Sequence, residues 1–116
     1  MQDGDVAERV AAWRSQLRKG SLELAVLAAL RKRRCYGLEL VDLLNRAELG
    51  ISEGSIYPLL ARLKAEGKVD AEWVDRGVGH AHKYYALTPH GEATLTAMLT
   101  AWREFNAAFE ALITTS

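Results

Sequence analysis

A small polar surface is predicted on one side of residues 52–67, SEGSIYPLLARLKAEG. If this segment is helical, at about 100° per residue, its apolar residues form one stripe, and Gly54 and Pro58 face directly away from it. Three hydrogen-bonding side chains flank these small residues: Ser55, Tyr57 and Arg62. Glycine costs a helix about 1 kcal/mol and an interior proline about 3, so an ordinary solvated face would not carry both. A hydroxyl, a phenol and a guanidinium around a small surface can hydrogen-bond a partner that comes close to the backbone.

Other groups that could do chemistry are sparse. His80, His82 and His90 have no carboxylate at matching spacing, so we expect no metal site. Cys35 is the only cysteine, which excludes an internal disulfide and argues against structural zinc. The sequence contains no nucleophile–base pair, no glycine-rich phosphate loop and no paired acids. We therefore expect neither a cofactor nor an enzymatic activity.

The charge distribution is more informative than the net charge, which is zero. Residues 14–83 contain 13 basic and 9 acidic side chains, whereas residues 1–13 and 84–116 each carry a net charge of −2. A basic middle between acidic ends is typical of a protein whose central face meets a polyanion, although so small a difference often has no function.

Composition predicts one soluble globular domain, because 49% of the residues are hydrophobic and 26% are charged. The beginning, MQDGDVAERV, is acidic and lacks an apolar signal core. No apolar run approaches the roughly 18 residues of a membrane span. We therefore expect a cytoplasmic protein.

Helical periodicity predicts five helices. Their approximate bounds are 5–18, 22–33, 38–47, 53–66 and 89 to near the chain end. Ser52 is a good N-cap for the fourth helix, and Thr88-Pro89 begins the fifth. The residues expected to face the core are Leu22, Val26, Leu27, Leu30, Leu38, Val41, Leu44, Ile56, Leu59, Leu60 and Leu63. We interpret the basic run RKRR, residues 31–34, as a solvated helix end, with phosphate binding as the alternative.

The apolar period changes to two after residue 67. Apolar and polar residues alternate in KVDAEWVD, residues 68–75, and again in KYYALT, residues 83–88. The loop between them, RGVGHA, contains two glycines, so these segments predict a β-hairpin. In this alternation Trp73 is expected to belong to the core.

The predicted order of elements is that of a winged helix-turn-helix, a mainly α fold with a β-hairpin wing. In this fold the third core helix enters the DNA major groove by its N-terminal end. Ser52, Gly54 and Ser55 lie at that end. Small residues there allow the backbone to approach DNA, and free N–H groups and hydroxyls can bind phosphate.

The sequence resembles the PadR-like transcriptional regulators. The resemblance rests on KGSLELAVLAAL (19–30), YGLEL (36–40), SEGSIYPLLARLKAEG (52–67) and EW…HKYYALTPHG (72–91), which together cover about four-fifths of the chain. It implies a dimeric DNA-binding repressor of the small subfamily, with a single helix after the wing. Some small members bind planar aromatic drugs in a pore at the dimer centre, between tryptophans of the two last helices.

The wing departs from the family pattern. Members usually carry a basic residue before Lys-Tyr-Tyr, whereas this chain has Ala81 and His82 there. The wing residues that we expect to contact DNA are Arg76, His80 and Lys83. From the fourth helix we expect contacts by Ser52, Gly54, Ser55, Tyr57 and Arg62. Two of these have alternatives, because Tyr57 could pack against the third helix and Arg62 could be a solvated charge.

The last helix carries an apolar seam with heptad spacing. The seam consists of Leu95, Met98, Trp102, Phe105, Phe109 and Leu112. It exceeds what a small core needs, so we expect a homodimer that uses this seam and the first helix, where Val6, Val10, Trp13 and Leu17 are aligned. Facing copies of Trp102, with Trp13 nearby, either pack together or leave a slot for a flat aromatic effector.

These observations divide the chain into three parts. Residues 1–18 and 89–116 are predicted to be dimerisation helices, and residues 19–88 the winged-helix DNA-binding core. The predicted function is a homodimeric repressor on a palindromic operator, released by a small aromatic ligand if the slot exists. The alternative is a winged-helix module that binds other proteins.

Overall fold

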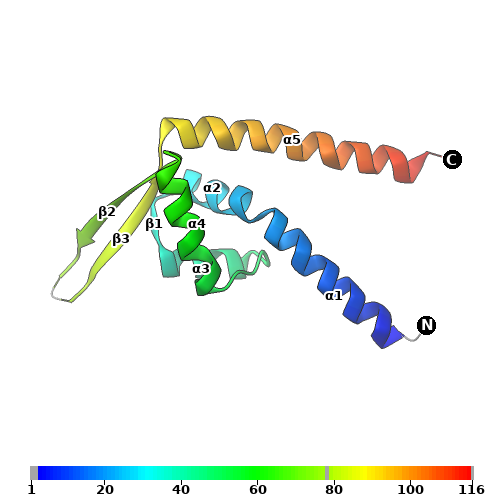
Figure 1. The fold of residues 1–116 in the computed structure, drawn as a ribbon, viewed down its shortest axis with the longest axis horizontal. Helices are drawn as coiled ribbons and strands as arrows, with labels where there is room; N and C mark the ends of the chain where they lie inside the picture. Colours follow the sequence, from blue (N-terminus) through cyan, green and yellow to red (C-terminus); the bar gives the residue numbers. More distant parts are fainter. Residues whose placement is uncertain (1–2, 78, 116) are drawn as a thin grey trace.

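The structure is a computed structural model that describes residues 3–77 and 79–115. Val78, in the predicted hairpin loop, lies outside these residues. The elements, shown in Figure 1, are α1 (Asp3–Gly20), α2 (Leu22–Lys32), β1 (Cys35–Tyr36), α3 (Gly37–Arg46), α4 (Glu53–Ala65), β2 (Val69–Asp75), β3 (Ala81–Leu87) and α5 (Pro89–Thr114). All five predicted helices and the predicted hairpin are present.

The core lies between α2, α3, α4, the sheet and the beginning of α5. The predicted stripe of α4 is confirmed, because Ile56, Leu59, Leu60 and Leu63 are all buried. Val26, Leu27 and Leu30 of α2 are also buried, as expected. In α3 the inward residues are Leu40 and Leu44. The expectation for Leu38 is wrong, since that side chain is 49% exposed at the start of α3.

The sheet has one strand more than the predicted hairpin. Its order is β1-β3-β2 and both pairings are antiparallel. In β1, Cys35 lies opposite Tyr85 and Tyr36 opposite Tyr84. A strand of two residues has no periodicity, so the sequence could not reveal it. Tyr84 and Tyr85, the residues of β3 that lie opposite β1, are both buried.

Trp73 is not a core residue, contrary to the prediction. It is 70% exposed and lies opposite Lys83 in the hairpin. Val69 lies on the same face of β2 as Trp73, four residues earlier and nearer the core, and it is buried. The alternation therefore identifies the correct face, but the hairpin extends beyond the helices that cover this face near its base. Figure 1 shows the hairpin projecting from the core as a narrow wing.

The beginning of α5 is tied to the base of the wing. Thr88 Oγ1 accepts a hydrogen bond from the Gly91 N–H at 3.0 Å and donates one to the Gly67 carbonyl at 2.6 Å. A Cβ on Gly91 would lie 2.0 Å from the Lys68 carbonyl oxygen. Only glycine therefore permits this close approach of α5 to the chain that enters β2.

Outside the core, α1 and α5 project from the same side of the molecule, away from the wing (Figure 1). The Cα radius of gyration is 17.2 Å, with extents of 60 × 33 × 21 Å. A compact domain of this length would have a radius of about 13 Å. Among the described helices, none combines the length and apolar character required to cross a membrane.

Candidate nucleic-acid interface

The start of α4 is an open, polar surface. Ser52 is the N-cap residue, but its hydroxyl lies 3.1 Å from the Ser55 hydroxyl and caps no backbone N–H. Gly54 is exposed, and a Cβ there would meet only the Ser52 hydroxyl, at 3.9 Å. Packing within the protein therefore does not require glycine at this position. The first N–H groups of a helix lack intrahelical partners, so this end can bind an anionic or hydrogen-bonding partner.

Tyr57 both packs and stays exposed. A Cβ on Gly37 would lie 2.4 Å from a Tyr57 ring carbon, so the ring covers the beginning of α3. The side chain is nevertheless 45% exposed. It shares a hollow with Leu38 of α3 and with Trp73 and Lys83 of the wing. The two alternatives weighed from sequence, packing and contact with a partner, are thus compatible.

The cations of the wing lie on both faces of the hairpin. Lys83 Nζ is 5.9 Å from the centre of the Tyr85 ring, on the face that carries Trp73. The Arg76 guanidinium is 5.4 Å from the centre of the Tyr84 ring. Because consecutive strand residues point to opposite faces, Arg76 and Lys83 are on different sides of the sheet. His80 is exposed in the loop, where its backbone N–H donates a hydrogen bond to the Gly77 carbonyl at 3.1 Å.

Arg62 is held by carboxylates from the protein itself. Its guanidinium lies 2.8 Å from Glu23 of α2 and 3.1 Å from Glu66. Lys68 joins the cluster, with Nζ 3.0 Å from Glu23 and 2.9 Å from Glu66. Burial alone would raise the pKa of Glu23, but the hydrogen bonds from Arg62 and Lys68 outweigh it and the pKa is lowered. Arg62 thus forms ion pairs that join α2 to α4 while its side chain stays half exposed, and its contact with DNA remains a prediction.

The basic run at the end of α2 is not simply solvated. Arg31 pairs with Glu92 at 3.7 Å, Arg33 with Glu39 at 3.3 Å and Arg34 with Glu72 at 2.8 Å. These arginines are exposed, as expected, but each one joins the end of α2 to another element. Their charges are partly neutralised, which argues against the alternative of phosphate binding.

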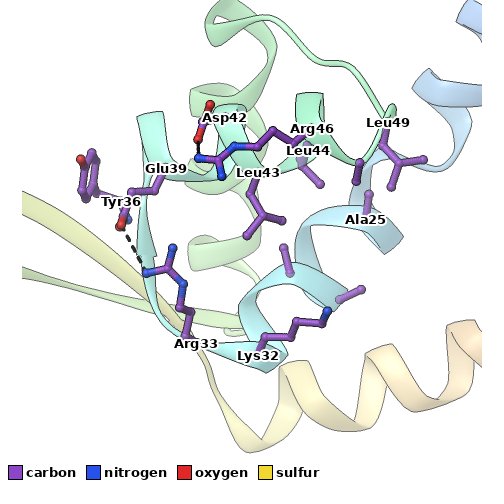
Figure 2. A pocket seen from close by; sticks show the side chains of 13 residues that line it. Ala25, Lys32, Arg33, Tyr36, Glu39, Asp42, Leu43, Leu44, Arg46 and Leu49 are labelled. Carbon is purple, nitrogen blue, oxygen red and sulfur yellow. Dashed lines mark hydrogen bonds and ion pairs between the residues drawn. The ribbon is translucent and has the colours of Figure 1, made fainter.

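A hollow between α2 and α3 is shown in Figure 2. Its floor consists of Ala25, Ala28, Ala29, Leu43 and Leu44. Its rim carries two ion pairs drawn in Figure 2, between Arg33 and Glu39 and between Arg46 and Asp42. These two pairs balance four of the charges that line the hollow, and Lys32 adds one positive charge.

A second exposed surface is apolar and is formed by α1 and α5. Trp102, Phe105, Phe109 and Leu112 are between 48% and 72% exposed, and Trp13 of α1 is 58% exposed. Trp13, Leu17, Met98, Trp102 and Phe105 line a cleft between the two helices. Leu95 was predicted to belong to the dimer seam, but it is fully buried against the protomer core. The seam therefore packs against the protomer core at Leu95 and is exposed from Trp102 onwards.

Trp73 and Leu38, which line the hollow beside Tyr57, are exposed, whereas the sequence predicts them to be core residues. The signal available for Trp73 was its distance from the base of the hairpin, since it lies two residues from the end of β2. No local signal distinguishes Leu38, because its neighbour Leu40 is equally apolar and occupies the core position instead.

The geometry defines a winged helix-turn-helix protein, with α4 in the position of the groove-reading helix and β2–β3 as the wing. Comparison with known proteins agrees with this class. The sequence model of the family described as transcriptional regulator PadR-like matches residues 26–97. The chain belongs to the PadR-like family of transcriptional regulators, whose members, like the relatives compared below, are regulators and not enzymes.

Solved structures and a curated relative are similar to most of this chain. A PadR-family transcriptional regulator from Eggerthella lenta superimposes with a TM-score of 0.87 at 30% identity, covering 97% of this chain and 98% of that one. Bacillus subtilis PadR in complex with operator DNA has a TM-score of 0.62 at 29% identity, covering 67% of this chain and 45% of that one. A transcriptional regulator of Mycobacterium tuberculosis is 32% identical over 83 residues, 70% of this chain and 75% of that protein.

Proposed function

We propose that this regulator is a repressor that binds a palindromic operator as a homodimer. The observation that carries the DNA-binding part is the open start of α4, where Gly54 has no packing role and the hydroxyls of Ser52 and Ser55 are exposed. Tyr57 extends this surface towards the wing. The similarity to a PadR protein that was determined in complex with operator DNA supports DNA binding by this chain.

In the proposed complex α4 enters the major groove and the wing follows the adjacent backbone. A wing that lies in a groove presents both faces to DNA, so Arg76, His80 and Lys83 can all contribute although they lie on different sides. These contacts fix the position of the protein on the duplex, whereas contacts from the start of α4 to base edges supply specificity.

The homodimer is supported by the surface of α1 and α5. Five large apolar side chains of α5 are about half to three-quarters exposed: Trp102, Phe105, Phe109, Leu112 and Ile113. An apolar surface of this extent marks a protein interface. In the proposed division, residues 1–18 and 89–116 mediate dimerisation and residues 19–88 bind DNA. A two-fold axis would place two copies of α4 one DNA turn apart, about 34 Å, on a palindrome.

Binding of a small planar aromatic effector is the second part of the proposal. Trp13 and Trp102 line the same cleft, whose volume of about 620 Å³ accommodates a small molecule. An aromatic ring stacked between indoles from two protomers would gain roughly 1 kcal/mol per stacked pair beyond the buried area. The competing arrangement is a closed dimer centre in which these tryptophans pack together.

DNA binding is tested with a duplex from the region upstream of the regulator's own gene and a scrambled duplex of equal length. We expect tighter binding to the upstream duplex, with affinity for both falling steeply as salt rises because phosphate contacts release counterions. Tyr57→Phe keeps the ring over Gly37 but removes the hydroxyl, and should weaken binding without loss of folding. A protein-binding module, the alternative function, would bind neither duplex with this salt dependence.

Effector binding is tested by titrating planar cationic dyes while recording tryptophan fluorescence. Saturable quenching is expected in the wild type and should be much reduced in Trp102→Phe. Trp73→Phe is the matched control, because Trp73 is exposed on the wing and is not among the residues that line the cleft. Quenching that persists unchanged in Trp102→Phe would place the dye elsewhere, and no quenching by any dye would indicate a closed dimer centre.

A further inference from the structure

The C-terminal part of α1 has a basic face beside the start of α4. Arg14 and Arg18 line a cleft with Asn45, Glu48 and Gly50, which lie between α3 and α4 or at the end of α3. Arg18 and Lys19 line a second cleft with Ser15, Ser52 and Ser55. Arg18 therefore belongs to both clefts and stands next to the two hydroxyls proposed to contact DNA.

The charges on this face are not neutralised by the protein. Arginines elsewhere, such as Arg9, Arg33 and Arg62, have a carboxylate within 4.0 Å. Within residues 3–77 and 79–115, no such ion pair involves Arg14, Arg18 or Lys19. Glu48 lines the same cleft as Arg14 and Arg18 but is not within ion-pair distance of them. The net charge of this surface is therefore positive.

Arg18 has a further unusual feature. Among the described side-chain nitrogen and oxygen atoms that are buried, its Nε is identified as lacking a hydrogen-bond partner. A buried donor without an acceptor is unfavourable, although Arg18 as a whole residue is partly exposed and lines both clefts. Because Nε itself is out of reach of solvent, a phosphate oxygen in the clefts would interact with the positive charge of Arg18 and not with this N–H.

We propose that Arg14, Arg18 and Lys19 bind the phosphate backbone of the same DNA duplex that receives α4. This inference rests on the proposed DNA-binding function and extends the interface to an element that sequence analysis assigned to dimerisation alone. The backbone on one side of the major groove would meet α1, and the wing with Lys83 would lie beyond α4. Such contacts fix the register of the protein on DNA and release counterions.

Dimerisation and DNA binding can coexist on α1 because they use different faces. The apolar stripe of Val6, Val10, Trp13 and Leu17 is centred about 110° around the helix from Arg18. Arg14 lies between the stripe and Arg18, whereas Lys19 lies beyond Arg18. Replacing these cations therefore leaves the apolar residues of the stripe in place.

The test uses fluorescence anisotropy with the labelled upstream duplex and the scrambled duplex at several salt concentrations. In the variant Arg14→Gln/Lys19→Gln both changed side chains are exposed, so folding should be unaffected. Near 0.1 M salt, we expect affinity for both duplexes to fall by about tenfold for each phosphate that the variant no longer neutralises, and the salt slope to decrease by about 1 for each. Arg18→Gln should behave similarly, whereas Arg18→Lys should retain most of the slope.

Arg9→Gln is the matched control for Arg18→Gln, since it also removes one positive charge from α1 but from a residue paired with Asp5 at 3.6 Å. It should change affinity by less than about twofold. If Arg14→Gln/Lys19→Gln and Arg18→Gln retain wild-type affinity and slope, the inference is wrong and the proposed function stands. If the wild type binds neither duplex at low salt, the proposed function itself is wrong. A decrease in affinity that coincides with dimer dissociation in sedimentation would also contradict the phosphate contact.

Discussion

At the scale of single residues, two glycines differ in what surrounds them. Gly91 lies against backbone, where a Cβ would be 2.0 Å from the Lys68 carbonyl oxygen. Gly54, in the first turn of α4, faces open space. The first glycine is required by packing, and the second is explained by a partner that approaches α4 closely.

Gly54→Ala should therefore separate stability from function. We expect the free energy of unfolding to stay the same or rise by up to about 1 kcal/mol, because alanine favours the helix. Affinity for the upstream duplex should fall, since the added methyl group occupies the space where DNA comes closest. Urea unfolding and anisotropy measure the two effects. Gly91→Ala is the control for a packing glycine and should be clearly destabilised; unchanged DNA affinity in Gly54→Ala would remove this glycine from the interface.

Sequence patterns predicted individual residues well where one helix face is buried along its whole length. All four members of the α4 stripe are buried, because a short helix against a core has only one apolar face. Trp73 and Leu38 were assigned wrongly because periodicity gives the face of an element but not the point where its neighbours end. Arg62 could not be assigned, since its partner Glu23 is 39 positions away along the chain.

At the scale of elements, the cluster of Glu23, Arg62, Glu66 and Lys68 joins α2, α4 and the segment before β2. Glu23 is central to it, since two cations contact its carboxylate. The pKa of Glu23 is below its ordinary value of about 4.5 in the folded protein. Its contribution to stability is therefore present above that value and is lost as the pH falls through the lowered pKa.

Glu23→Gln should lower the free energy of unfolding at pH 7 by about 1 to 2 kcal/mol. This range takes into account that Arg62 is half exposed, which weakens its ion pair with Glu23. Its stability should also decline less on acidification, because the titrating carboxylate is gone. Denaturant unfolding at pH 7 and pH 3.5 tests both expectations. Asp42→Asn, which breaks an exposed pair with Arg46, is the control and should change the free energy of unfolding very little. An equally steep acid decline in Glu23→Gln would contradict this role.

The order of elements was predictable because each helix has a capping residue or a turn at its boundary. Thr88 and Pro89 begin α5 where expected, and the Thr88 cap is present. The strand β1 was not predictable, because its two residues form a strand only by pairing with β3. The basic face of α1 was missed for a similar reason, since only the fold places Arg18 beside Ser52 and Ser55.

At the scale of the whole molecule, the protomer is more extended than a compact domain of its length. Its radius of gyration of 17.2 Å exceeds the expected value of about 13 Å, because α1 and α5 leave the core (Figure 1). The exposed part of α5 carries Phe105 and Phe109, whose rings meet edge to face at 4.9 Å. These rings are covered only in part by their own protomer, which favours a second copy as the missing partner.

Phe105→Glu/Leu112→Glu should convert the proposed dimer to a monomer. Both side chains are more than 60% exposed in the protomer, so the winged-helix core should keep its circular dichroism spectrum, and sedimentation would report the mass. The control is Thr100→Glu, which adds a charge to the opposite, exposed face of α5 and should leave the dimer intact. A double variant that sediments like the wild type would exclude this seam as the interface.

The hydrogen bonds that fasten Thr88 to the base of the wing also make α5 a lever. Its 26 residues extend about 39 Å from that attachment. A rotation of about 5° at the Thr88 end displaces the far end by about 3 Å over this length. In the proposed dimer, any change in the angle between two such levers alters the separation of the wings and of the two copies of α4. The spacing of operator half-sites that the protein accepts would then be set by how two α5 helices cross, at a distance from every residue that contacts DNA.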